Sequence, residues 1–239
     1  MKLHASLIVA AVEADRYLPV CVEHLDQFCD EVTELLDGER GSDFLGHEGR
    51  ARQALLELTL ARNPTHVLAI DADEFVTDGQ RLRALCREDA GPGAWTLNIE
   101  EVWKADDQAL WIRTDGAWGL QSRSPILYRV PAKIDGRWRI MDRQLACGRE
   151  PMAVRQLAAR APDSGVQVLH FGWTNESERA ARYQRYVDHD GGKFHRRAHL
   201  DSIMWPDSKV RLERRDWPES LEPFKAGILE RATWVASPA

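Results

Sequence analysis

Apolar runs and amphipathic stretches alternate along the N-terminal third of the chain. Continuous apolar runs at 3–12 and 66–70 are typical of strands that are buried on both faces of a sheet. Between them, apolar side chains recur at helical spacing over 16–29 and 50–62, and a strand-like run covers 31–36. The order β-α-β-α-β predicts an α/β fold with a doubly wound, mostly parallel sheet flanked by helices.

The pattern changes after the turn at 91–93. Short strand-like runs follow, separated by Gly, Pro and Asp, and they predict a smaller, mixed α+β half. These runs are 94–99, 110–113, 125–130, 138–141 and 166–171. Asn175 and Glu178 form a capping-box pattern that predicts a helix to about Asp188. The tail from 191 is rich in Arg, His, Pro and Trp, with weak periodicity.

Composition and charge exclude several classes of protein. The chain has 239 residues, of which 44% are hydrophobic and 29% charged, as in a folded globular protein with a full core. Its formal charge of −6 argues against bulk electrostatic binding of nucleic acid. We expect no transmembrane segment, because the longest apolar run is far shorter than the ~20 residues that a spanning helix needs.

The four cysteines contain no CxxC pair. In a chain of this length we expect them to be buried free thiols, which favours a cytoplasmic location.

Two aspartates follow the apolar run at 66–70. Asp71 and Asp73 lie where that strand should end, and ligands of open α/β sheets bind beyond the carboxyl ends of the strands. Alternate residues of extended backbone point the same way, so both carboxylates are expected to face one point. Two such charges repel unless a cation lies between them, and Mg²⁺ or Mn²⁺ prefers oxygen ligands. A D-x-D tripeptide is also common in plain acidic turns.

Segment 67–75 (VLAIDADEF) resembles the D-x-D strand of inverting family 2 glycosyltransferases with a GT-A fold. The resemblance spans roughly residues 3–190. Four further segments carry it: 12–19, 29–32, 49–53 and 168–173.

The resemblance implies a Rossmann-related, GT-A-like sheet and a metal-dependent, inverting sugar transfer. It assigns 1–93 to the half that binds the nucleotide sugar, 94–190 to the acceptor half, and 191–239 to an extension over the cleft. The donor would be a sugar on UDP, GDP or dTDP. The acceptor and the oligomeric state stay open.

The resemblance also implies roles for individual residues. Mn²⁺ or Mg²⁺ would be held by Asp71, Asp73 and His170. The donor would contact Glu13, Asp37, Arg50, Arg52 and Asp71. The two arginines could instead form a solvated helix face, and His170 could be structural.

An inverting transfer needs a carboxylate that deprotonates the acceptor hydroxyl. Asp142 is the first candidate from the resemblance, with an ion pair to a neighbouring arginine as its alternative. Its rivals are Glu100, Glu101 and Asp115. Flat aromatic faces stack on sugar rings. Trp118 and Trp173 lie in segments bounded by glycines, which suggest loops, and they are the candidates for contact with the acceptor. Both tryptophans could equally be core residues.

Two other functions compete with the transferase. A non-catalytic nucleotide-sugar or carbohydrate-binding module of the same fold is suggested by Leu36, which occupies a position where the family has an aspartate, and by the short segment 38–49. A nucleotidyltransferase also carries a strand-end acidic pair, but it usually has a Gly-rich basic loop after the first strand. Residues 12–15 (VEAD) are not such a loop.

Overall fold

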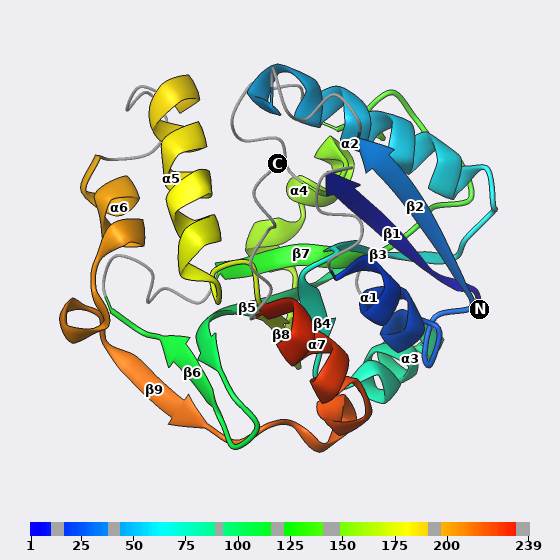
Figure 1. Ribbon diagram of the computed structural model, residues 1–239. Helices are drawn as coiled ribbons and strands as arrows, with labels where there is room; N and C mark the ends of the chain where they lie inside the picture. Colours follow the sequence, from blue (N-terminus) through cyan, green and yellow to red (C-terminus); the bar gives the residue numbers. More distant parts are fainter. Residues whose placement is uncertain are drawn as a thin grey trace. The chain divides into compact units, whose positions relative to one another are not determined.

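The computed structural model (Figure 1) describes residues 1–10, 17–37, 44–88, 93–115, 122–140, 149–190 and 197–232. The fold consists of two compact units. Unit 1 comprises Met1–Asn98 and Arg123–Val168, and unit 2 comprises Ile99–Ser122 and Leu169–Ala239. None of the helices in these described ranges is both long enough and apolar enough to span a bilayer.

Unit 1 is built on three parallel strands joined by two helices. In chain order these are β1 (Leu3–Ala10), α1 (Leu18–Leu25), β2 (Glu31–Asp37), α2 (Phe44–Leu60) and β3 (His66–Asp71). Strand β1 lies between β2 and β3 and is parallel to both. Figure 1 shows α1 and α2 on opposite sides of β1, as expected when the two crossovers run in opposite directions. The predicted β-α-β-α-β order is therefore confirmed.

The burial of these strands explains their apolar sequences. Leu3, Ala5 and Leu7 of β1 have no exposed surface, and the first five residues of β3 are all buried. Strands covered on both faces gain about 25 cal/mol for each Å² of apolar surface removed from water, and they need apolar residues at consecutive positions.

The sheet of unit 1 is mixed. Strand β7 (Ser122–Arg129) is antiparallel to β3, with Arg129 opposite His66, and the order continues from β2-β1-β3 to β7 and β5. The short strand β4 (Glu74–Val76) pairs with β8 (Asp163–His170). This is an open α/β sheet flanked by helices, which is compatible with a Rossmann-like fold.

The remaining elements of unit 1 are short. They are α3 (Gly79–Arg87), α4 (Met152–Arg155) and the 3-10 turn Ala158–Arg160. Strand β5 (Ala94–Ala105), like β8, contributes residues to both units.

Unit 2 combines an antiparallel sheet with helices. Strand β6 (Leu110–Arg113) pairs with β5 on one side and with β9 (Leu212–Arg215) on the other. Its helices are α5 (Glu176–Asp190), α6 (Arg197–Asp201) and α7 (Lys225–Ala232), with 3-10 turns at Ser202–Met204, Asp207–Lys209 and Glu219–Phe224.

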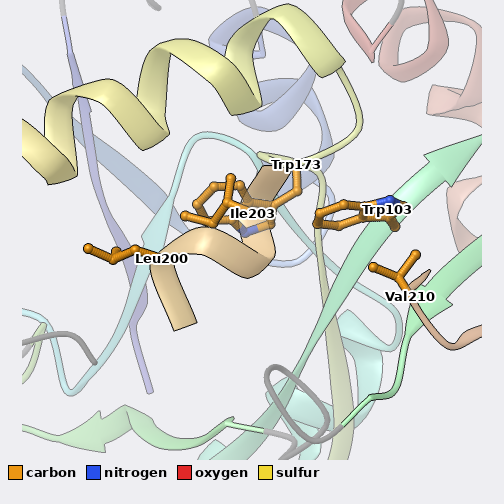
Figure 2. Close-up of a cluster of buried hydrophobic side chains, with 5 residues drawn as sticks. All are labelled: Trp103, Trp173, Leu200, Ile203 and Val210. Atoms are coloured by element: carbon orange, nitrogen blue, oxygen red, sulfur yellow. The ribbon is translucent and has the colours of Figure 1, made fainter. Parts of the chain in front are cut away.

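An aromatic cluster forms a buried core in unit 2. Its members are Trp103, Trp173, Leu200, Ile203 and Val210 (Figure 2). The guanidinium of Arg113 lies 4.5 Å from the ring centre of Trp103, and that of Arg179 lies 4.2 Å from it. These cation–π contacts let two arginines pack in an otherwise apolar core.

Several local expectations agree with the structure and others do not. The Asn175 cap is confirmed, because its Oδ1 accepts a hydrogen bond from the Glu178 N–H at 3.2 Å. The strand expected at 138–141 is wrong over 138–140, which has no regular structure apart from a bend at Arg139, and Met141 lies outside the described residues. Helix α2 begins six residues before the expected Arg50. Helices α3 and α7 and strands β4 and β9 had not been predicted.

Three of the four cysteines are free and buried, as expected: Cys21, Cys29 and Cys86. Burial raises the pKa of the Cys86 thiol to about 12 and holds that of Cys21 well above its ordinary value. These thiols are therefore protonated and unreactive at neutral pH. Cys147 lies outside the described residues.

Gly79 provides a test of packing in unit 1. A Cβ at Gly79, the first residue of α3, would lie 2.3 Å from Cγ and Cδ1 of Phe28, a ring that is only 3% exposed. We expect Gly79→Ala to lower the free energy of unfolding by about 1 to 3 kcal/mol, because a buried ring must move. Urea denaturation measures this loss.

Gly136→Ala is the matched control, since a Cβ there meets no atom within 4 Å. Equal urea midpoints for the two variants would contradict the close packing of Phe28 on α3.

Candidate functional site

The expected site lies at the carboxyl end of β3. Asp71 is the last residue of this strand, and it aligns with Ile8 of β1. The crossovers that leave β1 and reach β3 run in opposite directions, so the order of the strands reverses between β1 and β3. Ligands of doubly wound sheets bind in the crevice at such a switch point.

The two aspartates of the D-x-D motif do not lie on one continuous strand. Strand β3 ends at Asp71, Ala72 and Asp73 form a turn, and β4 begins at Glu74. The Glu74 carboxylate stabilises the turn by accepting a hydrogen bond from the Asp71 N–H at 3.0 Å. The expectation that extended backbone aims both carboxylates at one point is therefore wrong at this turn.

Two arginines contact the carboxylate of Asp71. Its Oδ1 accepts hydrogen bonds from both terminal nitrogens of Arg52 at 3.2 Å, and its Oδ2 lies 3.0 Å from Arg149. Arg149 also donates to Glu74, whose side chain has no exposed surface. Arg52 is anchored to Glu48 one helical turn earlier, at 2.9 Å. We call these five residues the strand-end ion-pair cluster.

The cluster keeps Arg149 charged despite its burial. Burial alone would lower the pKa of Arg149, but the carboxylates of Asp71 and Glu74 hold it above its ordinary value. A buried ion pair repays the cost of desolvation only when the geometry is good and further hydrogen bonds satisfy the charged atoms. Here both oxygens of Asp71 are satisfied by guanidinium groups.

The expected metal ligands do not form a ligand set in this arrangement. In the part of the chain that the structure describes, no three His, Cys, Asp or Glu side chains gather in a way that could hold a metal ion. Asp71 is compensated by arginines, and Nδ1 of His170 is hydrogen-bonded to Glu101 within unit 2. The residues as placed thus do not fit a divalent ion held by Asp71, Asp73 and His170.

Arg50 and Arg52 are directed to different places. They lie two positions apart on α2, which is roughly 200° around the helix, so they do not converge on one anion. Arg52 contacts Asp71, whereas Arg50 is exposed and lines a pocket of about 690 Å³ together with Arg139. Two further lining residues are linked by a hydrogen bond of 2.7 Å from the Ile140 N–H to the Gln53 side chain.

Unit 2 brings together two of the expected site residues. Glu101 on β5 and His170 at the end of β8 are joined by a hydrogen bond of 2.5 Å between Oε2 and Nδ1, and both side chains are partly exposed. Asp115 instead pairs with Arg113, which donates to both of its oxygens at 2.6 and 3.3 Å.

The acceptor role expected for Trp173 does not fit its position. Trp173 belongs to the buried cluster of unit 2 and is only 5% exposed (Figure 2). A ring that is covered by protein on its faces cannot stack on a sugar, so its alternative interpretation as a core residue is the one that the structure supports.

For four of the expected site residues the structure describes no side chain. Glu13, Trp118 and Asp142 lie outside the described residues. Asp37 ends β2, so its backbone is at the same edge of the sheet as Asp71.

Arg149 and Glu74 are cluster members that the sequence analysis missed. Arg149 lies 75 residues from Glu74, and no local pattern connects them. The Glu48–Arg52 pair, by contrast, has the i,i+4 spacing of helical ion pairs and was visible in the sequence.

Comparisons with known proteins add no relative. No family model matches the sequence, and no curated protein or solved structure matches the chain.

Removal of Arg149 tests the cluster. We expect Arg149→Ala to lower the free energy of unfolding by about 3 to 5 kcal/mol, because Glu74 would keep a buried charge without its guanidinium partner. Urea denaturation at pH 7 measures the loss. The double variant Arg149→Met/Glu74→Gln should recover part of it, since residue 74 then no longer carries a buried charge.

Arg137→Ala is the control, because its ion pair with Asp135 is on the surface and such pairs contribute little. If Arg149→Ala were as stable as Arg137→Ala, the cluster would not be a stabilising element.

Proposed function

We propose that the chain is a glycosyltransferase that takes its sugar from a nucleoside-diphosphate donor bound at the β1/β3 edge of unit 1. The observation that carries the proposal is the position of Asp71 at the carboxyl end of β3, beside β1, where the strand order reverses. The resemblance of the D-x-D segment to family 2 glycosyltransferases supports the same function.

In this proposal the diphosphate binds to the two arginines of the strand-end ion-pair cluster. Arg52 and Arg149 are both directed to the edge of the sheet where a donor would bind, and planar guanidinium groups form paired hydrogen bonds with phosphate oxygens. A diphosphate that approached Asp71 would compete with its carboxylate for these donors. A role for Mn²⁺ or Mg²⁺ stays a prediction from the resemblance, and we derive no step through it.

The acceptor hydroxyl would be deprotonated by Glu101, with His170 as its positioning partner. The Glu101 side chain is partly exposed, whereas both oxygens of Asp115 accept hydrogen bonds from Arg113. The acceptor oxygen would form a bond to the anomeric carbon as the bond from that carbon to the diphosphate breaks. The proton would go to Glu101, and the electron pair would leave with the nucleoside diphosphate.

The second candidate is a binding module that holds a nucleotide sugar without transferring it. It is favoured by the pairing of both Asp71 oxygens with arginines, which leaves this carboxylate no part in activating the donor. A cytoplasmic location remains a prediction under either candidate.

Calorimetric titration with UDP-, GDP- and dTDP-sugars tests the proposal, each in Mn²⁺, Mg²⁺ and EDTA. We expect one nucleotide class to bind. Because Asp73 lies in the turn that follows β3, at the edge proposed for the donor, Asp73→Ala should weaken binding at least tenfold. The unfolding transition of this variant should be unchanged. Asp107→Ala, which removes an exposed carboxylate of unit 2, is the matched control.

The outcomes separate the candidates. If no nucleotide sugar binds, the proposed function is wrong. Binding without hydrolysis or transfer would support the binding module. Undiminished turnover in EDTA would contradict a role for the metal ion but not the transferase function.

The pH dependence of donor hydrolysis tests the proposed base. Glu101→Gln should lower kcat about 100-fold or more and abolish the decline of the rate at low pH, because the amide cannot accept the proton. His170→Gln should retain more activity and shift that decline. Glu176→Gln, an exposed residue at the start of α5, is the control. An unaltered pH profile in Glu101→Gln would exclude Glu101 as the base.

A further inference from the structure

A second pocket of unit 1 lies at the opposite end of β3. Its volume is about 360 Å³, which is within the range of small-ligand sites. Arg129 lines this pocket and lies opposite His66, the first residue of β3, in the pairing of β7 with β3. Asp71 is the last residue of β3. Five residue steps of extended strand separate these ends, about 17 Å. The pocket is therefore distinct from the edge proposed for the donor.

Cations dominate the polar part of this pocket. The described residues that line it include Arg129, Lys133 and Arg137 but only one carboxylate, Asp135. Asp135 accepts hydrogen bonds from Arg137 at 2.7 and 3.0 Å, and this pair neutralises itself. Arg129 donates to the backbone oxygen of Glu88 at 2.7 Å. Within the described residues, Lys133 forms no ion pair, and it is exposed.

The rest of the wall is apolar and includes an indole ring. Trp138 is half-buried, and its ring meets Tyr128 edge to face at 6.0 Å between centroids. Val154 and Leu157 line the same cavity, and Leu157 is 42% exposed, which is unusual for a large apolar side chain. A flat ring in the cavity would cover apolar surface that is now in contact with water.

We propose that this pocket binds a small organic anion that joins a flat ring to a phosphate or carboxylate group. Among the described residues, three cationic side chains and one carboxylate line the cavity, and Lys133 adds a positive charge to its wall although the whole chain carries −6. Cations that share one cavity repel each other, and a bound anion removes that repulsion. The ring of the ligand packs on Trp138, and its anionic group lies against Lys133. The proposal does not depend on the proposed function.

Titration with phenyl phosphate tests the site, because this probe carries a ring and a phosphate but no nucleoside. Binding is followed through the indole N–H resonances in NMR spectra, with inorganic phosphate and phenol as separate arms. We expect phenyl phosphate to shift the Trp138 resonance and to bind more tightly than either fragment. Lys133→Glu should weaken binding at least tenfold.

Lys209→Glu is the matched control, since it makes the same charge change on an exposed residue of unit 2. Equal weakening by the two variants would reduce the effect to net charge and overturn the proposal. A loss of binding in Arg50→Glu but not in Lys133→Glu would also overturn the proposal. The probe would then occupy the pocket that Arg50 lines on α2. Unchanged binding of nucleotide sugars to Lys133→Glu would show that the two sites are separate.

Discussion

The carboxylate of Asp71, held between two guanidinium groups, is the interaction on which the rest of unit 1 depends. Arg52 reaches it from helix α2 and Arg149 from a segment that follows β7, so one side chain ties a helix, a strand end and a distant part of the chain together. Glu74 extends the network into the turn that separates β3 from β4. Because these charges have little contact with water, removing one leaves another uncompensated.

The same network sets the chemical character of the sheet edge. A strand-end carboxylate in an open α/β sheet is a natural ligand for a cation, but here the cation is supplied by the protein itself. At this edge the guanidinium groups of Arg52 and Arg149 contact both oxygens of Asp71.

Unit 2 uses its aromatic residues differently from what a sugar-binding surface would need. The guanidinium groups of Arg113 and Arg179 both lie over the ring of Trp103, and Trp173 packs in the same core. Large rings bury more apolar area than any other side chain, so their first use in a small unit is to build its core. The polar pair formed by Glu101 and His170 remains partly exposed, and the chemistry of the unit is concentrated there.

The sequence by itself determined the parallel β-α-β-α-β frame, the position of Asp71 at a strand end and the cap at Asn175. These features depend on the spacing of neighbouring residues, which a local pattern records. Helix α3 was also within reach, because Leu82, Leu85 and Cys86 lie on one face, but β9 reads LERR and became a strand only by pairing with β6. Tertiary structure alone decided that Asp71 is paired with Arg149, that Glu101 is paired with His170, and that Trp173 is buried. Such pairs join residues about 70 or more positions apart, and their formation depends on how the whole chain is packed, so no local periodicity encodes them.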